Sequence, residues 1–158
     1  MDALGKIVEI LITVILLFIA PLYIIAGMKD ISNQVYLNTQ MTLFVDTVRN
    51  QGYIDESLYE SFVNSLESTG NVYDIKMIHY CQMYDEEYNN YYMESYNDLI
   101  VPKIYEDGYM MSMGDLFSVE IIMKNQTLFD KLIGIFIGGD GKEDSIQSYG
   151  GVIRDEAY

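Results

Sequence analysis

The sequence predicts an α+β protein built on one long N-terminal helix, and three patterns in the chain support this fold class. An apolar run of 21 residues begins at Ile7, and apolar residues then recur at helical spacing in two further segments. Two later segments alternate apolar and polar residues, as strands do. Because helical and strand patterns occupy separate stretches of the chain, we expect helices packed on a small antiparallel sheet.

The apolar run begins at Ile7, ends at Gly27 and contains one charged residue, Glu9. At about 1.5 Å per residue, a helix of this length spans roughly 30 Å, the thickness of the hydrocarbon core of a bilayer. A buried helix of a soluble protein fits less well, because no polar stripe interrupts the run. We therefore expect residues 1–30 to form a transmembrane anchor. Pro21 lies inside it, removes one backbone hydrogen bond and is expected to kink the helix.

A cleaved secretory signal is the alternative to an anchor. Such signals have a basic start, an apolar core of about 7–15 residues and a cleavage site of small residues. Here the core is longer, residues 1–6 contain one acidic and one basic residue, and no site of the A-x-A kind follows Gly27. The length and the flanks of the run favour an uncleaved anchor.

The remaining domain, residues 31–158, is expected outside the cell, although charge alone does not fix this orientation. Lys6 and Lys29 flank the run on opposite sides, so the positive-inside rule does not decide the orientation. A short N-terminal segment before a large domain favours a single-pass protein of the cell membrane with an extracellular C-terminal domain. The chain has 24 acidic and 9 basic residues and a net charge of −15, which suits a water-exposed surface and excludes nucleic acid as a partner.

The single cysteine, Cys81, excludes an intrachain disulfide.

Helical patterns continue after the anchor. An apolar stripe at i, i+3, i+4 and i+7 consists of Met41, Phe44, Val45 and Val48. Gly52 supplies a left-handed stop, and no helix breaker lies within residues 32–50. We therefore expect the anchor to continue into this helix as one stalk, with a bend near Gly27.

A second helix has a clear start signal. Asp55 is a suitable N-cap, Glu56 lies in the first turn, and Tyr59 is placed for a hydrophobic staple with Ile54. Gly70 is expected to end this helix. Its apolar face consists of Leu58, Phe62, Val63 and Leu66.

Three segments are predicted as strands. Apolar side chains alternate with other residues over residues 73–79 and 117–123. The third segment, residues 146–154, contains Gly150 and Gly151, a pair that indicates a bulge or a close approach of another chain segment. Two further helices are expected between the strands, at about residues 92–106 and 128–137.

Candidate chemical sites are few, and we expect no catalytic residue, metal ligand or cofactor. His79 and Cys81 lie two apart and share one face of a strand, but each is the single residue of its type, and a tetrahedral metal site needs three or four ligands. Residues 140–144 are acidic but lack the spacing of a calcium-binding loop, which favours a solvated turn. Asn125 begins an N-glycosylation triplet, although Thr127 fits a helix N-cap equally well and is preferred as one.

The most unusual composition lies between Tyr80 and Tyr109, where eight tyrosines alternate with acidic residues. Tyrosine offers a large contact area at a low entropy cost, so this segment suits protein association. The same tyrosines are equally suited to covering a small sheet, and both interpretations remain open.

Glu9 is unusual because a carboxylate is costly inside hydrocarbon. It either lies at the membrane interface or meets a cation of a neighbouring subunit. An apolar N-terminal helix with an early Glu, a stalk and a small α+β head resembles type IV pilins. More closely, several segments are similar to the TadE-like, pseudopilin-type proteins of tight-adherence (Tad) pilus loci in Gram-positive anaerobes. These segments are residues 44–49, 52–54, 59–62, 66–75, 113–119 and 148–153.

The resemblance implies a non-enzymatic, pilin-like component of a Tad-type pilus or secretion apparatus. Its partners would be other pilin-like subunits and the assembly machinery, with no cofactor and no small-molecule substrate. It also implies cleavage after Gly5, which would make Lys6 the new N-terminus. The chain departs from the family pattern there, because the leader is short and lacks lysine, and Glu9 would be the fourth mature residue instead of the fifth.

Two other classes of function remain as alternatives. The first is a membrane-tethered extracellular binding or sensor domain, which predicts a concave pocket in the head. The second is an anchored enzyme, which the single His, the single Cys and the lack of a nucleophile motif disfavour.

Overall fold

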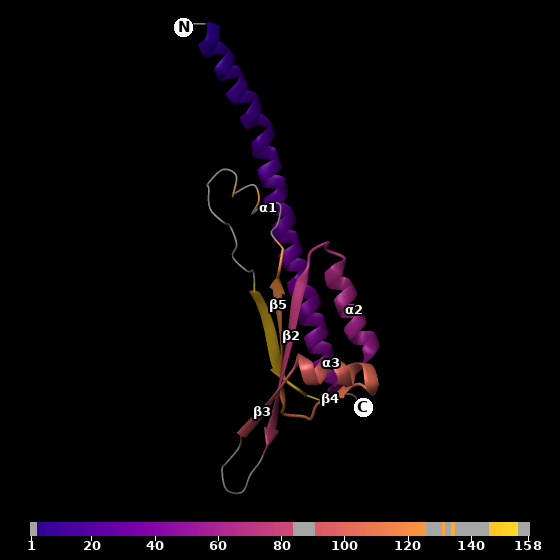
Figure 1. Cartoon of the computed structure of the whole chain (residues 1–158). Helices are drawn as coiled ribbons and strands as arrows, with labels where there is room; N and C mark the ends of the chain where they lie inside the picture. Colours follow the sequence, from indigo (N-terminus) through magenta and orange to yellow (C-terminus); the bar gives the residue numbers. More distant parts are fainter. Residues whose placement is uncertain (1–2, 84–90, 126–130, 132–133, 135–145, 155–158) are drawn as a thin grey trace. The chain divides into compact units, whose positions relative to one another are not determined.

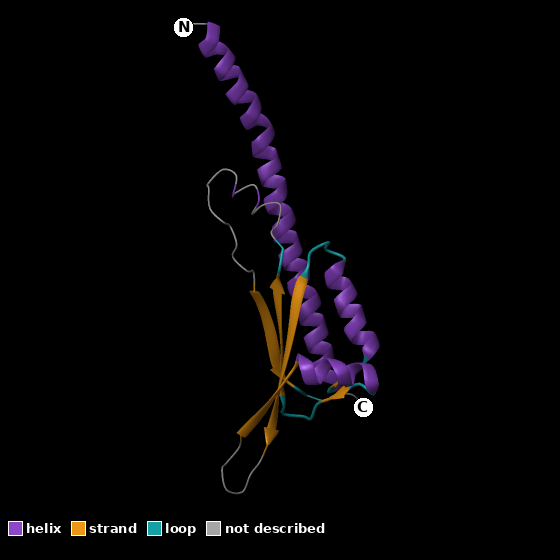
Figure 2. Ribbon diagram, in the orientation of Figure 1, coloured by secondary structure: helices purple, strands orange, loops and turns teal. Residues whose placement is uncertain are grey.

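The computed structural model describes residues 3–83, 91–125, 131, 134 and 146–154 of the chain. In these residues a long N-terminal helix precedes a small head of helices and antiparallel strands, which confirms the predicted α+β class (Figures 1 and 2). The elements, in chain order, are α1 (Ala3–Gln51), β1 (Tyr53–Ile54), α2 (Glu56–Glu67), β2 (Tyr73–Met83), β3 (Tyr91–Tyr96), α3 (Asn97–Glu106), β4 (Tyr109–Met110), β5 (Leu116–Met123) and β6 (Ile146–Val152).

Helix α1 is a single α-helix of 49 residues, which confirms the predicted continuity of anchor and stalk. The chain divides into two compact units, Met1–Val35 with Gln126–Glu143, and Tyr36–Asn125 with Asp144–Tyr158, and α1 contributes to both. The helix is not interrupted at Pro21 or at Gly27. It ends as predicted at Gly52, which has a left-handed φ of 64° and donates its N–H to the carbonyl of Val48 at 2.8 Å.

The larger sheet has the strand order β3-β2-β5-β6, and all neighbouring strands are antiparallel. The two strands with the clearest alternation, β2 and β5, pair directly from Tyr73↔Met123 to Tyr80↔Leu116, which confirms the expectation that they share one sheet. The face of the sheet that carries Met77, Phe117 and Val119 is buried. On the opposite face, Lys76 and Glu120 are paired across the two strands at 3.6 Å.

The head core joins the C-terminal part of α1, α2 and the sheet. The ring of Phe44 stacks on Phe62 of α2 at 4.3 Å between centroids and meets the edge of Phe117 of β5 at 6.3 Å. The stripe predicted on α1 is fully buried in this core, so a part of the long helix serves as a structural element of the head. The core residues are Leu37, Met41, Phe44, Val45, Val48, Ile54, Phe62, Leu66, Met77, Ile100, Ile104, Tyr109, Met111, Phe117, Val119, Ile121 and Ile153.

Helix α2 begins at the predicted cap. The carboxylate of Asp55 accepts hydrogen bonds from the Leu58 amide at 2.7 Å and from the Ser57 hydroxyl at 3.0 Å. Ile54 is fully buried, and Tyr59 packs against the same core, as a hydrophobic staple requires. The helix ends at Glu67, and Gly70 follows in a turn with a left-handed φ of 75°.

The prediction of a helix over residues 92–106 was wrong for its first part. Residues Tyr91–Tyr96 form strand β3, which pairs with the outer part of β2, and α3 begins at Asn97. Aromatic residues favour strands, and an available edge of β2 decided the structure of this segment. Asn97 marks the change, because its side chain accepts the amide proton of Met77 at 2.6 Å and donates to the carbonyl of Ile75 at 2.5 Å.

A small second sheet, in which β1 pairs with β4, was not predicted from the sequence. Gly108 makes this approach possible, because it has a φ of 84° and an added Cβ would lie 2.1 Å from the hydroxyl oxygen of Tyr53. That hydroxyl donates to the carbonyl of Asp107 at 3.2 Å. The helix expected at residues 128–137 lies outside the described residues except for Lys131 and Gly134.

Candidate functional site

The most prominent candidate for function is the apolar part of α1. Its large apolar side chains are exposed to solvent from Leu4 onward, for example Ile7 at 61% and Leu17 at 66%. Among the described residues, α1 is the one helix that is long and apolar enough to cross a membrane. Exposure of so much apolar surface on one helix is unfavourable in water, so its length and composition fit a membrane span or a signal anchor.

The residues predicted for processing and assembly lie at the start of α1. Helix formation begins at Ala3, so Gly5, Lys6 and Glu9 are helical and exposed. A Cβ on Gly5 would contact nothing within 4 Å, so packing among the described residues gives no reason for a glycine there. None of the ion pairs found among the described residues includes Glu9, whose backbone carbonyl accepts the hydroxyl of Thr13 at 2.8 Å.

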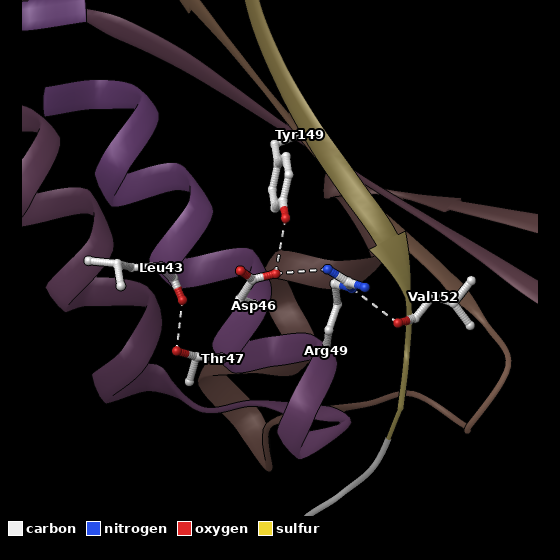
Figure 3. A network of polar contacts seen from close by, with 6 residues as sticks. All are labelled: Leu43, Asp46, Thr47, Arg49, Tyr149 and Val152. Carbon is white, nitrogen blue, oxygen red and sulfur yellow. Dashed lines mark hydrogen bonds and ion pairs between the residues drawn. The ribbon is translucent and has the colours of Figure 1, made fainter. Parts of the chain in front are cut away.

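A polar network connects the end of α1 to strand β6 (Figure 3). One carboxylate oxygen of Asp46 accepts from Arg49 at 2.8 Å and from the Tyr149 hydroxyl at 3.2 Å. The Nε of Arg49 donates to the carbonyl of Val152 at 3.1 Å, and the Arg49 carbonyl accepts the amide proton of Arg154 at 2.8 Å. Helix α1 is therefore fastened to the edge strand of the sheet by polar contacts in addition to its buried stripe.

The paired glycines of β6 are explained by this junction. The register from Leu116↔Val152 to Ile122↔Ile146 is continuous, so β6 has no bulge, and a close approach is the correct one of the two predicted alternatives. A Cβ added to Gly151 would lie 2.6 Å from the guanidinium carbon of Arg49. A Cβ added to Gly150 would lie 2.7 Å from the backbone oxygen of Phe117.

A second polar cluster is buried inside the head. The two ring nitrogens of His79 lie 2.8 Å from the hydroxyl of Tyr109 and 3.0 Å from a carboxylate oxygen of Asp115. The same oxygen of Asp115 accepts the amide proton of Ser112 at 2.8 Å. Since an ionised carboxylate can only accept, Nε2–H of His79 donates to Asp115. The cluster connects β2, β4 and the turn before β5.

Cys81 lies beside this cluster, and its surroundings favour the neutral thiol. Burial raises the pKa of the Cys81 thiol, and the negative charge and hydrogen bond of Asp115 raise it further. The reactive thiolate is therefore disfavoured. Burial likewise raises the pKa of Tyr109, with the charges of Cys81 and Asp115 acting in the same direction and a hydrogen bond from Ser95 acting against them. Within the described part of the chain no group of three or more His, Cys, Asp or Glu side chains is arranged to hold a metal ion.

The tyrosine-rich segment is only partly described, because residues 84–90 lie outside the described residues. Tyr109 is buried in the core, whereas Tyr96 and Tyr105 are about half exposed. The ring of Tyr105 meets Tyr59 edge-on at 6.2 Å. The described tyrosines thus include one that stabilises the head and others with surface available for contacts, so both interpretations of the segment still hold.

Asn125 of the glycosylation triplet has a structural role. Its side chain accepts the amide proton of Val72 at 3.0 Å and donates to the side chain of Asn71 at 3.1 Å, so it connects the end of β5 to the start of β2. The helix cap expected at Thr127 and the acidic turn at residues 140–144 lie outside the described residues.

The described part of the head has hollows on both sides of α2. One of about 130 Å³ lies between α1 and α2, beside Leu43 and Leu58. Another of about 290 Å³ lies between α2 and the start of β2, beside Leu66 and Tyr73. Sites for small molecules usually measure about 300–1,000 Å³. The first hollow is too small for such a ligand, and the second is at the lower limit.

Comparison with known proteins does not assign a family. No protein-family model matches the sequence, and no curated protein and no solved structure matches the chain.

Proposed function

We propose that this protein is a non-enzymatic, pilin-like subunit of a Tad-type pilus or related secretion apparatus. In this proposal residues 7–27 cross the cell membrane once, and the α+β head lies on the extracellular side. The partners are other pilin-like subunits and the assembly machinery. The observation that carries the proposal is the single helix α1, whose exposed apolar part and whose buried head part belong to one unbroken element.

This continuity suits a subunit that must transmit force between an anchor and a head. No flexible linker separates the apolar run from Met41 and Val45, which are buried in the head core. The contacts of Asp46 and Arg49 with β6 fasten the same helix to the sheet.

Two features at the start of α1 support the same proposal. A glycine in an exposed helix costs about 1 kcal/mol relative to alanine, and the described packing offers no compensation at Gly5. Recognition by a processing peptidase would explain its presence. Glu9 has an ionic cost of roughly 2.5–3.5 kcal/mol at the centre of a bilayer, less near the interface, which a cation of a neighbouring subunit would offset.

The buried cluster of the head supports a structural role over an enzymatic one. His79 and Asp115 are 5% and 3% exposed, so a substrate has no direct access to them. The thiol of Cys81 has a raised pKa and is a poor nucleophile. The hydrogen bonds described for His79, Tyr109 and Asp115 all connect separate segments of the chain.

The proposal is tested by the variant Glu9→Gln in cells that contain the assembly machinery. We expect membrane insertion to be unchanged or slightly improved, while cross-linking between anchors and incorporation into the assembly fall. The matched control is Asp30→Asn, which removes one negative charge of α1 outside the apolar run. Equal cross-linking of Glu9→Gln and the unaltered protein, at equal surface delivery, would show that Glu9 merely lies at the water interface.

The same preparation tests processing. If a peptidase cleaves after Gly5, the intact mass of the membrane-extracted protein will correspond to a chain that begins at Lys6. A mass that includes Met1 would instead identify an uncut anchor.

A further inference from the structure

The segment of α1 that follows the apolar run has an apolar stripe on one side. Between residues 28 and 35 the apolar side chains are Met28, Ile31 and Val35, and the intervening residues are polar or charged. They are 66%, 65% and 60% exposed, and Ile24 is 56% exposed one turn earlier. At 3.6 residues per turn these four positions fall within about 60° of the helix circumference. By contrast Ala26, on the opposite side, is 8% exposed.

The spacing of this stripe is that of a coiled-coil seam. The intervals from Ile24 to Met28, Ile31 and Val35 are four, three and four residues, which is the a/d pattern of a heptad repeat. Going back through the apolar run, the pattern continues over Pro21 to Leu17 and Val14, which are also exposed. Within the apolar run, exposed apolar residues lie on every side of the helix, so the seam is defined by residues 24–35, where polar residues flank it on the C-terminal side.

Charge favours a second copy of the same helix as the occupant of this seam. The flanking e and g positions from residue 25 to residue 34 are Ile25, Gly27, Ser32 and Gln34, none of which is charged. In a chain with a net charge of −15, an identical partner meets no like-charge repulsion along the seam. Lys29 lies well away from it, about 100° around the helix from Met28 and about 160° from Ile31.

We propose that the stripe Ile24–Met28–Ile31–Val35 pairs in parallel and in register with the same stripe of a second copy of this chain. The pairing rests on the membrane anchoring in the proposed function, because anchors inserted at the same depth present the stripe at the same height and in the same direction. The paired unit is a two-stranded seam that begins in the last turn of the span at Ile24, continues outside the membrane to Val35, and forms before the subunit meets any assembly machinery.

The test is disulfide formation in membranes from cells that express the full chain alone, with Cys81→Ser as background. In a parallel, in-register pair, identical a or d positions face each other, so Met28→Cys and Ile31→Cys should yield at least about fivefold more dimer than Lys29→Cys after oxidation with copper phenanthroline. Ile31→Glu combined with Met28→Cys should abolish the dimer, whereas the matched Ser32→Glu should not.

Three outcomes would overturn the pairing. Equal yields at residues 28, 29 and 31 would mean random collision, and no dimer at any of them would mean that the stripe faces lipid headgroups. Stronger cross-linking of a mixed sample of Met28→Cys and Val35→Cys than of either variant alone would show a staggered contact. Because no assembly machinery is present, each of these results leaves the Glu9 experiment to decide the proposed function separately.

Discussion

At the scale of single residues, the stability of the head depends on buried polar groups that are hydrogen-bonded to each other. It also depends on glycines at positions where another chain segment comes too close for a side chain. His79 and Asp115 illustrate the first case, since burial of a polar group is tolerated only when its hydrogen bonds are satisfied. The sequence indicated the buried position of His79 through the alternation of β2. It could not indicate the partners, because Tyr109 and Asp115 lie 30 and 36 residues away and belong to other elements.

The stability of the head should fall at alkaline pH because of two tyrosines, the buried Tyr109 and the partly buried Tyr59. Burial is the main cause that raises the pKa of both Tyr109 and Tyr59 in the folded protein. A raised pKa means that the neutral phenol is favoured by folding, so this contribution is present below the unfolded pKa of about 10 and is lost as the pH rises through the folded pKa. We expect the urea midpoint of the detergent-solubilised chain to decrease above about pH 10. The variants Tyr109→Phe and Tyr59→Phe should each show a shallower decrease, and slopes identical to the unaltered protein would contradict this explanation.

The two glycines of β6 should differ in their tolerance of alanine. At Gly150 the added methyl group meets the backbone of Phe117 and Ser118, which cannot move without breaking the strand pairing, so we expect a loss of about 1–3 kcal/mol. At Gly151 it meets the flexible end of Arg49, which can rotate away, so the loss should be smaller. Thermal unfolding of Gly150→Ala and Gly151→Ala measures the difference, and the reverse order of stability would contradict the packing described for β6.

At the scale of elements, the predictable ones were those whose own sequence carries the signal. The buried stripe of α1, the Asp55 cap of α2 and the alternation of β2 and β5 were all confirmed. Strand β3 was not predicted, because apolar and polar residues do not recur at a clear strand or helix period in Tyr91–Tyr96. The structure of this segment depends on the edge of β2 with which it pairs. The two-residue strands β1 and β4 are likewise defined only by each other. Elements of this kind cannot be found without the tertiary context that pairs them.

The junction between α1 and β6 makes a prediction at this scale. Arg49→Ala removes the bond to the Val152 carbonyl and the ion pair with Asp46, and the Arg49 side chain is only 14% exposed. Hydrogen bonds from charged groups contribute about 1.5–3 kcal/mol, so we expect a comparable loss of stability. Amide hydrogen exchange in residues 146–152 should also become faster.

A surface ion pair of the same sheet provides the control. Lys124 and Asp74 lie 3.2 Å apart, but both side chains are about half exposed, so Lys124→Ala should cost no more than about 1 kcal/mol. If Arg49→Ala and Lys124→Ala have the same effect on stability and on exchange in β6, the network in Figure 3 does not fasten the helix to the sheet.

At the scale of the whole molecule, the proposed function requires α1 to lie partly in the membrane and partly in the core of the head. Its first part exposes apolar side chains along most of its circumference, and its last part is buried in the head. The proposed subunit uses both, and this requires that the anchor remains attached and that the head faces outward.

The most direct test of that claim is labelling of a single cysteine in the head of intact cells. Glu60 is exposed on α2, so Glu60→Cys in the Cys81→Ser background gives a suitable site. We predict that a membrane-impermeant maleimide labels it fully before the cells are permeabilised, and that the labelled chain remains in the membrane pellet after extraction with alkaline carbonate. Labelling only after permeabilisation, or release of the head into the carbonate supernatant, would contradict a single-pass anchor with an extracellular head.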